Sequence, residues 1–430
     1  MQGVAQGRSL SELLPAVPAE LRPGVQALTF QVLRQLGTAR ALVAQLAPRK
    51  PDSAVHALLC SAVALLLHEP GDADKGAAPS AFVPYAAHTV VNQAVDAARQ
   101  QRSTQRQAAF VNACLRRFLR ERTALQAAVA SDLEARWNHP RWWIERMQRD
   151  HPDHWQAILT ANNQPGPMTL RVNRRLSDPA SYQQALQTAG LAAQPVGENG
   201  LMLAQPQPVD RLPGFADGLC SVQDAAAQLA APLLLAGRDW SNSARVLDAC
   251  AAPGGKTAHL LELSDLDLLA LDVDPHRCER ITDTLQRLRL RAKVQAGDAA
   301  RPADWWDGQP FDAILLDAPC TASGIVRRHP DVRWLRRESD VEQLAAVQRQ
   351  LLESLWPLLK PGGRLVYATC SVFLAEGAFQ LDSFLERHTD AVSGPAPGHL
   401  LPGNAGAPAA VRDNEPGGHD GFFYARIDKR

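Results

Sequence analysis

The sequence predicts an α/β protein whose C-terminal part is a doubly wound, Rossmann-like sheet, preceded by an all-α domain and a small α+β connecting domain. Three observations support this prediction. Strand and helix patterns alternate from about residue 233 onward. A short apolar run, Val246–Ala249, leads into the pair Gly254–Gly255 and then into a helical pattern. An acid, Asp272, ends the next strand-like run.

The stretch from Val246 to Thr257 reads Val-Leu-Asp-Ala-Cys-Ala-Ala-Pro-Gly-Gly-Lys-Thr, which predicts a strand, a tight turn and a helix start. The two glycines lack the Cβ atoms that would keep a ligand away from the backbone, and the free N–H groups of the new helix face that ligand. We therefore expect a nucleotide-like ligand on this turn.

Two other interpretations of the turn are weaker. A phosphate-binding P-loop needs a glycine five residues before the Gly-Lys-Thr, and Cys250 occupies that position. A strand–helix turn that binds nothing would leave to chance both the paired glycines and the acid 17 residues past Gly255, at Asp272. A doubly wound fold requires such an acid, because it holds a ribose hydroxyl.

Length and composition indicate a globular protein of two or three domains, with 430 residues of which 46% are hydrophobic. The longest apolar run, Ala57–Leu67, is about half of the roughly 20 residues that cross a bilayer, and the N-terminus has no signal-peptide layout. We therefore expect a cytoplasmic protein. The formal net charge is zero, so a nucleic acid would be held by local basic patches.

The seven cysteines do not form a disulfide or metal pattern. They contain no Cys-x-x-Cys pair, the closest two are 28 residues apart, and their number is odd. Any functional cysteine is therefore expected to be a reduced thiol, and no metal site is predicted.

Residues 1–130 are expected to form a helical bundle, because apolar residues recur at spacings of three and four. Its clearest segment, Arg99–Arg122, carries seven arginines and the single acid Glu121. This imbalance favours contact with phosphates over a merely solvated surface. A Gly- and Pro-rich loop is expected from Pro70 to Pro84. The inward stripe is predicted to consist of Phe110, Val111, Cys114, Leu115 and Phe118, with Arg116 and Arg120 facing outward.

Residues 131–232 are expected to form the small connecting domain. Met168–Asn173 alternates as a strand, a helix is expected around Ser181–Gly190, and short strands continue to Leu203. Three arginines, Arg171, Arg174 and Arg175, either touch a polyanion or charge an exposed strand edge.

The region 233–430 is expected to hold the doubly wound sheet. A Pro- and Gly-rich stretch, Ser393–Gly418, is predicted to be a long surface loop before the last strand. The expected strands lie near 244–248, 267–272, 293–297, 311–317, 364–369 and 421–427.

Acids end three successive strand-like runs, at Asp272, Asp298 and Asp317. Because ligands of an open parallel sheet bind at the carboxyl ends of its strands, the three acids are expected to converge on the glycine turn. One acid for the ribose, one near an adenine amine and one close to the reacting centre would suit an adenosyl ligand. A single strand-ending aspartate would be weak evidence, since such residues are common.

Two cysteines are expected at the same edge, Cys320 in Asp-Ala-Pro-Cys and Cys370 in Thr-Cys-Ser directly after a strand. Most cysteines are small core residues, and Cys60, Cys114 and Cys278 are interpreted in that way. A thiol in a ligand crevice is different, because local positive potential can deprotonate it and make it a nucleophile. That potential is expected from Lys256 and from the arginines of residues 325–337.

These motifs resemble a known family. The order Ala-Ala-Pro-Gly-Gly-Lys-Thr, Leu-Asp-Val-Asp, Asp-Ala-Pro-Cys, Arg-Arg-His-Pro-Asp, Tyr-Ala-Thr-Cys-Ser and Asp-Gly-Phe-Phe-Tyr-Ala is similar to that of the S-adenosylmethionine-dependent RNA cytosine-5 methyltransferases, particularly the bacterial Sun/Fmu type that acts on 16S ribosomal RNA. The resemblance covers nearly the whole chain. It implies a NusB-like RNA-binding domain at 1–130, a connecting domain at 131–232 and a methyltransferase domain at 233–430. It also implies that most of the first helix of the NusB-like domain is missing.

The resemblance further implies roles for individual residues. Cys370 would be the nucleophile, and Cys320 would help to release the product. The expected substrate is 16S ribosomal RNA in an unassembled or partly assembled small subunit. The protein is expected to be a monomer and to have no membrane partner. S-adenosylmethionine would be bound by Cys250, Ala251, Ala252, Pro253, Gly254, Gly255, Lys256, Asp272, Asp298 and Asp317.

Two thiols suit this chemistry. Cytosine C5 is a poor nucleophile, and a thiolate that adds to C6 makes C5 enamine-like and able to take a methyl group. The methylated C5 must then lose its proton so that the thiol can leave. Two rival functions are a DNA cytosine methyltransferase, whose nucleophile would be the Pro-Cys thiol, and an RNA-binding assembly factor that has kept the fold without catalysis.

Overall fold

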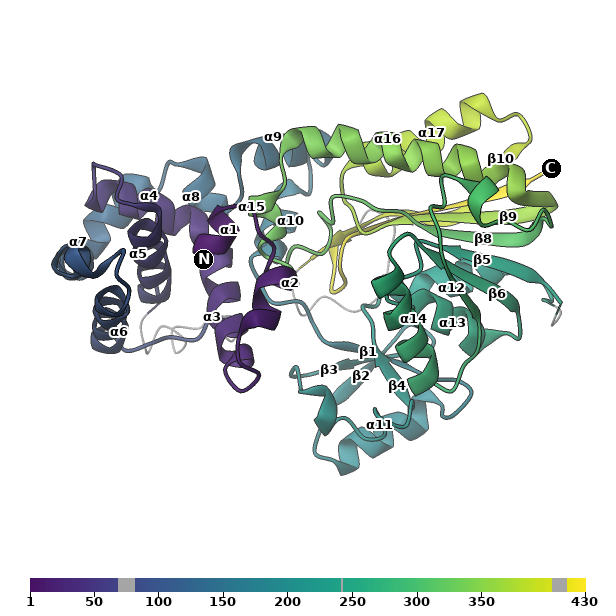
Figure 1. The fold of residues 1–430 in the computed structure, drawn as a ribbon, viewed down its shortest axis with the longest axis horizontal. Helices are drawn as coiled ribbons and strands as arrows, with labels where there is room; N and C mark the ends of the chain where they lie inside the picture. The colour runs from purple at the N-terminus through teal and green to yellow at the C-terminus, as the bar shows by residue number, and fades with distance from the viewer. Residues whose placement is uncertain (69–81, 241–242, 404–415) are drawn as a thin grey trace. The chain divides into compact units, whose positions relative to one another are not determined.

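The computed structural model describes residues 1–68, 82–240, 243–403 and 416–430, which divide into two compact units (Figure 1). The helical unit comprises Met1–Pro165 and Val326–Glu338. The α/β unit comprises Gly166–Ile325 and Ser339–Arg430. The predicted loop at 70–84 lies largely outside the described residues.

The helical unit is built from short α-helices around one apolar core, which includes Leu33, Leu42, Leu59 and Val111. Helical structure continues well past residue 130, where composition alone placed the end of the bundle. The helices are α1 (Gln2–Ala5), α2 (Leu10–Leu13), α3 (Arg22–Arg34), α4 (Leu36–Leu46), α5 (Ser53–Leu66), α6 (Ala87–Gln100), α7 (Ala108–Val129), α8 (Leu133–Trp137), α9 (Arg141–Asp150), α10 (Trp155–Asn162) and α15 (Val332–Leu335).

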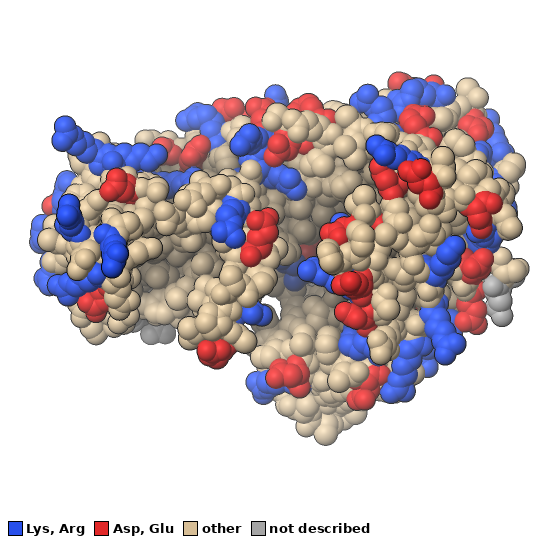
Figure 2. All heavy atoms as spheres, viewed as in Figure 1, with Lys and Arg blue, Asp and Glu red and all other residues tan. Residues whose placement is uncertain are grey.

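The predicted basic helix is broken into two. Helix α6 ends at Gln100 and α7 begins at Ala108, because the polar residues between them form turns, and α7 is kinked at Glu121. The inward stripe is confirmed except for Phe110, which is 38% exposed. Arg116 and Arg120 are exposed as expected, and basic side chains are prominent on the helical unit in Figure 2.

The segment Val326–Glu338 joins the helical unit although it lies between two strands of the α/β unit in the sequence. The carboxylate of Asp331 accepts a hydrogen bond from the N–H of Leu10 at 2.8 Å. The indole of Trp334 donates to the carbonyl of Leu33 at 2.9 Å. The fully buried Arg333 of the same segment donates to the carbonyl of Asn138 at 3.1 Å. These contacts make the segment part of the helical core.

A small antiparallel sheet begins the α/β unit, in the order β2-β3-β1-β4. The expected strand and helix are confirmed, and β4 is an additional strand. Helix α11 packs on the sheet through Tyr182 and Leu186, which share a core with the strand residue Leu170. The elements are β1 (Thr169–Val172), α11 (Pro179–Thr188), β2 (Ala193–Val196), β3 (Gly200–Leu203) and β4 (Cys220–Val222).

The larger sheet has the order β11-β10-β12-β9-β8-β5-β6-β7, with β7, β6, β5, β8 and β9 mutually parallel. This confirms the doubly wound, Rossmann-like prediction. The strands are β5 (Arg245–Ala249), β6 (Asp267–Asp272), β7 (Lys293–Ala296), β8 (Phe311–Asp317), β9 (Leu359–Thr369), β10 (Ala391–Pro402), β11 (Pro416–Gly417) and β12 (Phe422–Lys429). The helices are α12 (Ala230–Leu235), α13 (Gly255–Leu263), α14 (Pro275–Arg287), α16 (Glu338–Leu355) and α17 (Ala378–Arg387).

Helices cover both faces of the sheet (Figure 1), and alternating side chains of the strands contribute to two cores, one on each face. On one face, Val246 packs with residues of α12, α13 and α14, such as Leu260 and Ile281. On the other, its neighbour Leu247 packs with residues of α16 and α17, such as Leu355 and Phe384. This two-sided burial explains why the strands read as continuous apolar runs.

The predicted loop at 393–418 is wrong in its first part, because β10 runs from Ala391 to Pro402 and pairs antiparallel with β12. The register shifts between Gly394 and Gly398, and Gly398 has φ +69°. Such an irregularity accommodates prolines that lack the N–H needed by a regular ladder. Proline and glycine content therefore indicated a loop where the chain forms a bulged strand. Residues 404–415 lie outside the described residues.

The helices of the described ranges include none with the length and hydropathy needed to span a membrane.

Candidate active site

The carboxyl ends of five parallel strands form one edge, and the predicted site residues follow these strands in spatial order. Thr369 of β9 precedes Cys370, and Asp317 of β8 lies opposite Ala368 of β9. Strand β5, which leads into the glycine turn, pairs with β8 on one side and β6 on the other. Asp272 at the end of β6 lies opposite Ala296 of β7, two residues before Asp298. The sheet therefore brings the predicted residues together.

The glycine turn has a backbone that only glycine tolerates at its centre. Gly254 has φ +92°, and a Cβ there would lie 3.1 Å from the Cα of Ile281. Cys250 also has positive φ, at 62°. A Cβ on Gly255 would meet nothing closer than 3.7 Å, so this side of the turn is open to a ligand. Helix α13 begins at Gly255 and directs its free N–H groups outward.

Asp272 connects β6 to this turn. Its Oδ2 accepts a hydrogen bond from the N–H of Ala252 at 3.0 Å, and its Oδ1 lies 3.4 Å from Nη1 of Arg277. The carboxylate is almost fully buried. Asp272 therefore holds the backbone of Ala252 in place, in addition to its expected role toward a ribose.

Asp298 and Asp317 are more accessible. Asp298 accepts a hydrogen bond from the N–H of Ala300 at 2.9 Å, and its side chain is partly exposed. The Oδ2 of Asp317 lies 2.6 Å from Nζ of Lys256. Burial disfavours the charged Lys256 ammonium, but Asp317 outweighs this effect and raises the pKa of Lys256 above its ordinary value. The site therefore contains a fixed positive charge.

The two thiols are neighbours, with 3.3 Å between Sγ of Cys320 and Sγ of Cys370. Cys320 is buried and Cys370 is partly exposed. The hydrogen bond with Cys370, burial and the negative charges nearby raise the pKa of Cys320 well above its ordinary value. Cys320 therefore stays protonated at neutral pH, and Cys370 is the more accessible of the two thiols.

The other cysteine of the edge, Cys250, has a different character. Burial, together with Asp317, Asp272 and Asp248, raises the pKa of Cys250 to about 12. Its thiol stays protonated at neutral pH and is not a candidate nucleophile. Burial raises the pKa of Cys60 to about 12 as well, in agreement with its interpretation as a core residue.

Sequence reasoning missed two buried acids at the site. Asp248 is fully buried beneath the turn, accepts a hydrogen bond from Thr257 Oγ1 at 2.5 Å, and has no partner among the described residues for its Oδ1. Burial raises the pKa of Asp248 to about 7. Glu376 is fully buried beside the loops that carry Cys320 and Cys370. Each is a lone acid in an apolar stretch, which is the sequence signal that was available.

Two expectations about arginines are wrong. Arg333, from the stretch 325–337, is fully buried in the helical unit and bonds to carbonyl groups there. Arg171 is also fully buried; it forms a two-pronged ion pair with Glu262 and donates to the carbonyl of Gly255. Neither side chain reaches an external polyanion. Arg171 instead supports the glycine turn through its hydrogen bond to the carbonyl of Gly255.

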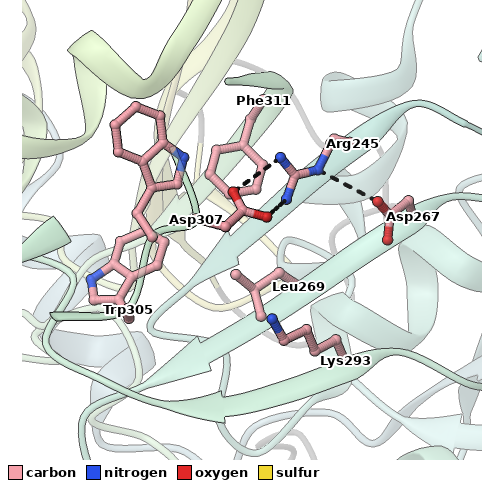
Figure 3. A pocket seen from close by; sticks show the side chains of 8 residues that line it. Arg245, Asp267, Leu269, Lys293, Trp305, Asp307 and Phe311 are labelled. Atoms are coloured by element: carbon pink, nitrogen blue, oxygen red, sulfur yellow. Dashed lines mark hydrogen bonds and ion pairs between the residues drawn. The ribbon is translucent and has the colours of Figure 1, made fainter. Parts of the chain in front are cut away.

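A small hollow lies at the amino ends of strands β5, β6, β7 and β8 (Figure 3), whereas the thiols follow the carboxyl ends of β8 and β9. Arg245, the first residue of β5, is ion-paired there with Asp307 at 2.8 Å and with Asp267 at 3.5 Å. The hollow has a volume of about 30 Å³, which holds about one water molecule. This hollow is too small for a nucleotide-like ligand.

The edge suits an adenosyl cofactor chemically. Gly255 leaves the turn open, the N–H groups of α13 face outward, and the carboxylates that follow β6, β7 and β8 can accept hydrogen bonds from ribose hydroxyls and an adenine amine. No group of three or more His, Cys, Asp or Glu side chains in the described part of the chain is arranged to hold a metal ion.

Solved structures share this architecture. The structure of the protein PH0851 matches with a TM-score of 0.76 and 26% identity, covering 96% of this chain and 91% of that one. A methyltransferase homologue from Pyrococcus horikoshii matches with a TM-score of 0.57 and 28% identity, covering 69% of this chain and 97% of that one. With the glycine turn and the row of acids, this likeness defines an S-adenosylmethionine-dependent methyltransferase.

Sequence comparisons identify the family. Residues 235–428 match the model of the 16S rRNA methyltransferase RsmB/F family, and residues 139–210 match its ferredoxin-like domain. The ribosomal RNA small subunit methyltransferase B of Vibrio cholerae is 40% identical over 441 residues, which cover 100% of this chain and 95% of that protein. The chain belongs to the RsmB/F family of rRNA methyltransferases.

Proposed function

We propose that this protein transfers a methyl group from S-adenosylmethionine to C5 of a cytosine in small-subunit ribosomal RNA through a covalent adduct with Cys370. The observation that carries the proposal is the 3.3 Å approach of the Cys320 and Cys370 sulfur atoms at the cofactor edge of the sheet. A single thiol would suffice for many reactions. Two adjacent thiols suit a reaction in which a bond to sulfur is first made and then broken.

Cys370 is the nucleophile in this proposal. Its thiolate adds to C6, and the electron pair of the C5–C6 double bond becomes available at C5, which is otherwise a poor nucleophile. Bound S-adenosylmethionine supplies the methyl group that C5 takes up. The positive charge of Lys256 lies close enough to Cys370 for the two to interact electrostatically.

Cys320 assists the release of the product. After methylation a base removes the C5 proton, the C5–C6 double bond re-forms, and the C6–S bond breaks with its electron pair returning to Cys370. A neutral thiol 3.3 Å away can donate a hydrogen bond to the departing thiolate. The raised pKa of Cys320 keeps that thiol protonated at neutral pH.

The acids and the turn position the cofactor. We assign cofactor binding to Cys250, Ala251, Ala252, Pro253, Gly254, Gly255, Lys256, Asp272, Asp298 and Asp317. The support is their common position at the edge and the open side of Gly255. We also assign to Asp317, which lies opposite Ala368 two residues before Cys370, a hydrogen bond to the target base. This second role would favour the C6 adduct.

Ribosomal RNA is the proposed substrate because the curated relatives are named for it. The exposed arginines of α6 and α7, among them Arg99, Arg116 and Arg120, can contact phosphates. The target cytosine must leave its stack to reach Cys370, and an unpaired loop makes this least costly. We expect a cytoplasmic monomer that acts on free or partly assembled small-subunit RNA.

The test is methyl transfer to small-subunit RNA by the full-length protein, with bisulfite sequencing to locate the modified base. We expect the variant Cys370→Ala to bind S-adenosylmethionine as the natural protein does and to transfer no methyl group. Cys114→Ala, which removes a buried thiol of the helical unit, is the matched control and should stay active. Full activity of Cys370→Ala would remove the covalent mechanism. Methylation at a position other than cytosine C5 would exclude the proposed specificity.

Two rivals predict different results. A DNA cytosine methyltransferase with Cys320 as nucleophile would lose adduct formation in Cys320→Ala, whereas the proposal predicts that this variant keeps the adduct. An assembly factor without catalysis would bind the cofactor and RNA but give no methylated product under any condition.

A further inference from the structure

Glu376 is a buried carboxylate that connects the two loops carrying the thiols. We propose that Glu376 is a positioning residue of the thiol pair: it holds Cys320 and Cys370 at their mutual distance by accepting hydrogen bonds from the residue that follows each cysteine. This inference rests on the proposed function, because it assigns Glu376 to the reaction of those thiols.

The hydrogen bonds around the carboxylate come from three separate parts of the chain. Thr321, which follows Cys320, donates its N–H to Oε1 at 2.8 Å and its hydroxyl to Oε2 at 2.5 Å. Ser371, which follows Cys370, donates its hydroxyl to Oε2 at 2.6 Å. Gln348 of α16 donates to Oε1 at 3.1 Å. Both oxygens are therefore shared between the Cys320 loop and another element.

The backbone of Glu376 is hydrogen-bonded to the sheet, in addition to the bonds that its side chain forms with the loops. Its carbonyl accepts hydrogen bonds from the phenol of Tyr367 at 2.7 Å and from the hydroxyl of Thr369 at 3.2 Å. Both donors belong to β9, the strand that ends just before Cys370. Glu376 thus links β9, through its carbonyl, to the loop that follows β8, through its carboxylate.

Further hydrogen bonds connect the same two loops. The hydroxyls of Ser323 and Ser371 lie 2.8 Å apart, and the N–H of Gly324 donates to the carbonyl of Cys370 at 3.0 Å. None of these bonds involves the thiols themselves. The relative position of the two sulfur atoms is consequently determined by the hydrogen bonds between their loops. Glu376 is the central acceptor of this network.

A carboxylate suits this position because an ionised carboxylate only accepts hydrogen bonds. The four donors satisfy both oxygens, which offsets the cost of burying the group. An amide would place two N–H groups against existing donors. Burial raises the pKa of Glu376, and the donors from Ser371 and Thr321 counteract this effect. The negative charge of Glu376 is also one cause of the raised pKa of Cys320.

The expected consequence of disturbing Glu376 is a change in thiol geometry with little change in cofactor binding. A misplacement of about 1 Å at a reacting group costs roughly 10²-fold in rate. In the described part of the chain, Glu376 forms no hydrogen bond with the glycine turn or with the acids after β6 and β7. These retain their own supports, such as the hydrogen bond from the N–H of Ala252 to Asp272.

The experiment compares Glu376→Gln with the natural full-length protein by two independent measurements. The first is steady-state methyl transfer to small-subunit RNA together with S-adenosylmethionine binding. We expect kcat to fall about 10²-fold, with cofactor affinity and the KM for RNA unchanged within twofold. The second is capture of phenylarsine oxide, which binds two adjacent thiols at once. We expect capture at the Cys320–Cys370 pair to slow at least tenfold.

Asp428→Asn is the matched control. Asp428 is the partner of the buried Arg364 at the opposite end of the β9–β12 pair, 2.9 Å away, so its loss removes a carboxylate of the same sheet without touching the thiol loops. This variant should lose stability while keeping the arsenical reaction and kcat. If Glu376→Gln changes only stability, as Asp428→Asn does, the positioning role is excluded.

Thr321→Val and Ser371→Ala serve if Glu376→Gln does not fold. Each removes one donor to Glu376, and each should slow arsenical capture and lower kcat; normal capture in both would overturn the proposal. The arsenical measurement also separates this proposal from the proposed function. An active Cys370→Ala enzyme would refute covalent catalysis, whereas normal arsenical capture in the Glu376 variant would refute positioning.

Discussion

The Nζ of Lys256 lies 2.6 Å from Oδ2 of Asp317, so the first turn of α13 is joined to the carboxyl end of β8 by an ion pair. This pair lies between the glycine turn and the two thiols along the edge of the sheet. It connects the turn that we propose to hold the cofactor to the thiols that we propose to perform the chemistry.

Replacing Asp317 by asparagine should therefore impair the reaction more than folding. We expect kcat for methyl transfer to fall by about 10²-fold, because Lys256 loses its counter-charge and the target base keeps only a neutral amide oxygen as acceptor. Asp312→Asn is the control, since Asp312 forms an ion pair with Lys360 at 2.8 Å at the other end of the same strand. Steady-state kinetics should show a loss of kcat only in Asp317→Asn. Equal losses of kcat in both variants would show that the position of the ion pair at the site does not matter.

Replacing Cys320 by alanine should trap the enzyme on RNA. The adduct still forms through Cys370, but the departing thiolate loses the neutral hydrogen-bond donor 3.3 Å away. A denaturing gel should show a slow-migrating band that requires both S-adenosylmethionine and Cys370. Absence of the band in Cys320→Ala, with the methylated product still released at the natural rate, would contradict the release role.

Replacing Arg171 by methionine should destabilise the α/β unit. Glu262 would be left as an unpaired buried charge, which typically costs about 3–5 kcal/mol. Urea unfolding should show this loss, and Arg171→Met combined with Glu262→Leu should recover more than half of it. Asp265→Asn, which breaks the exposed pair with Arg175, should cost less than about 1 kcal/mol. Cofactor affinity should also fall in Arg171→Met, because Gly255 loses a hydrogen bond from Arg171.

Asp248 should make stability depend on pH. Burial raises the pKa of Asp248 to about 7 in the folded protein, above its ordinary value of 3.8. The folded state therefore binds more protons than the unfolded state between these values, and its stability falls as the pH rises from about 4 to about 7. Asp248→Asn keeps an acceptor for Thr257 and removes this titration. Unfolding at several pH values should show its stability relative to the natural protein improving by up to about 4 kcal/mol over that range.

Much of the site was predictable because it depends on strand order. Asp272, Asp298 and Asp317 end or closely follow strand-like runs, and parallel strands place such residues at a common edge. The neighbouring thiols followed from the same rule, as Cys320 and Cys370 come shortly after β8 and β9.

Features that depend on distant partners were not predictable. The partners of Glu376 come from residues 321, 348 and 371, and nothing near Glu376 in the sequence identifies them. Arg171 looked like an exposed strand charge because its partner, Glu262, lies 91 residues away. Strand β10 was missed because its bulge tolerates the prolines and glycines that usually indicate a loop.

The segment Val326–Glu338 makes the two units inseparable by a single cut of the chain. A protein truncated to begin at Gly166 would keep this segment but lose its partners, leaving the apolar faces of Trp334 and Leu335 exposed to water. Asp331, whose carboxylate anchors α2, comes only eleven positions after Cys320 in the sequence. The helical unit is thus assembled from two separate stretches of the chain, and deleting its N-terminal stretch would leave residues 326–338 without the core on which they pack.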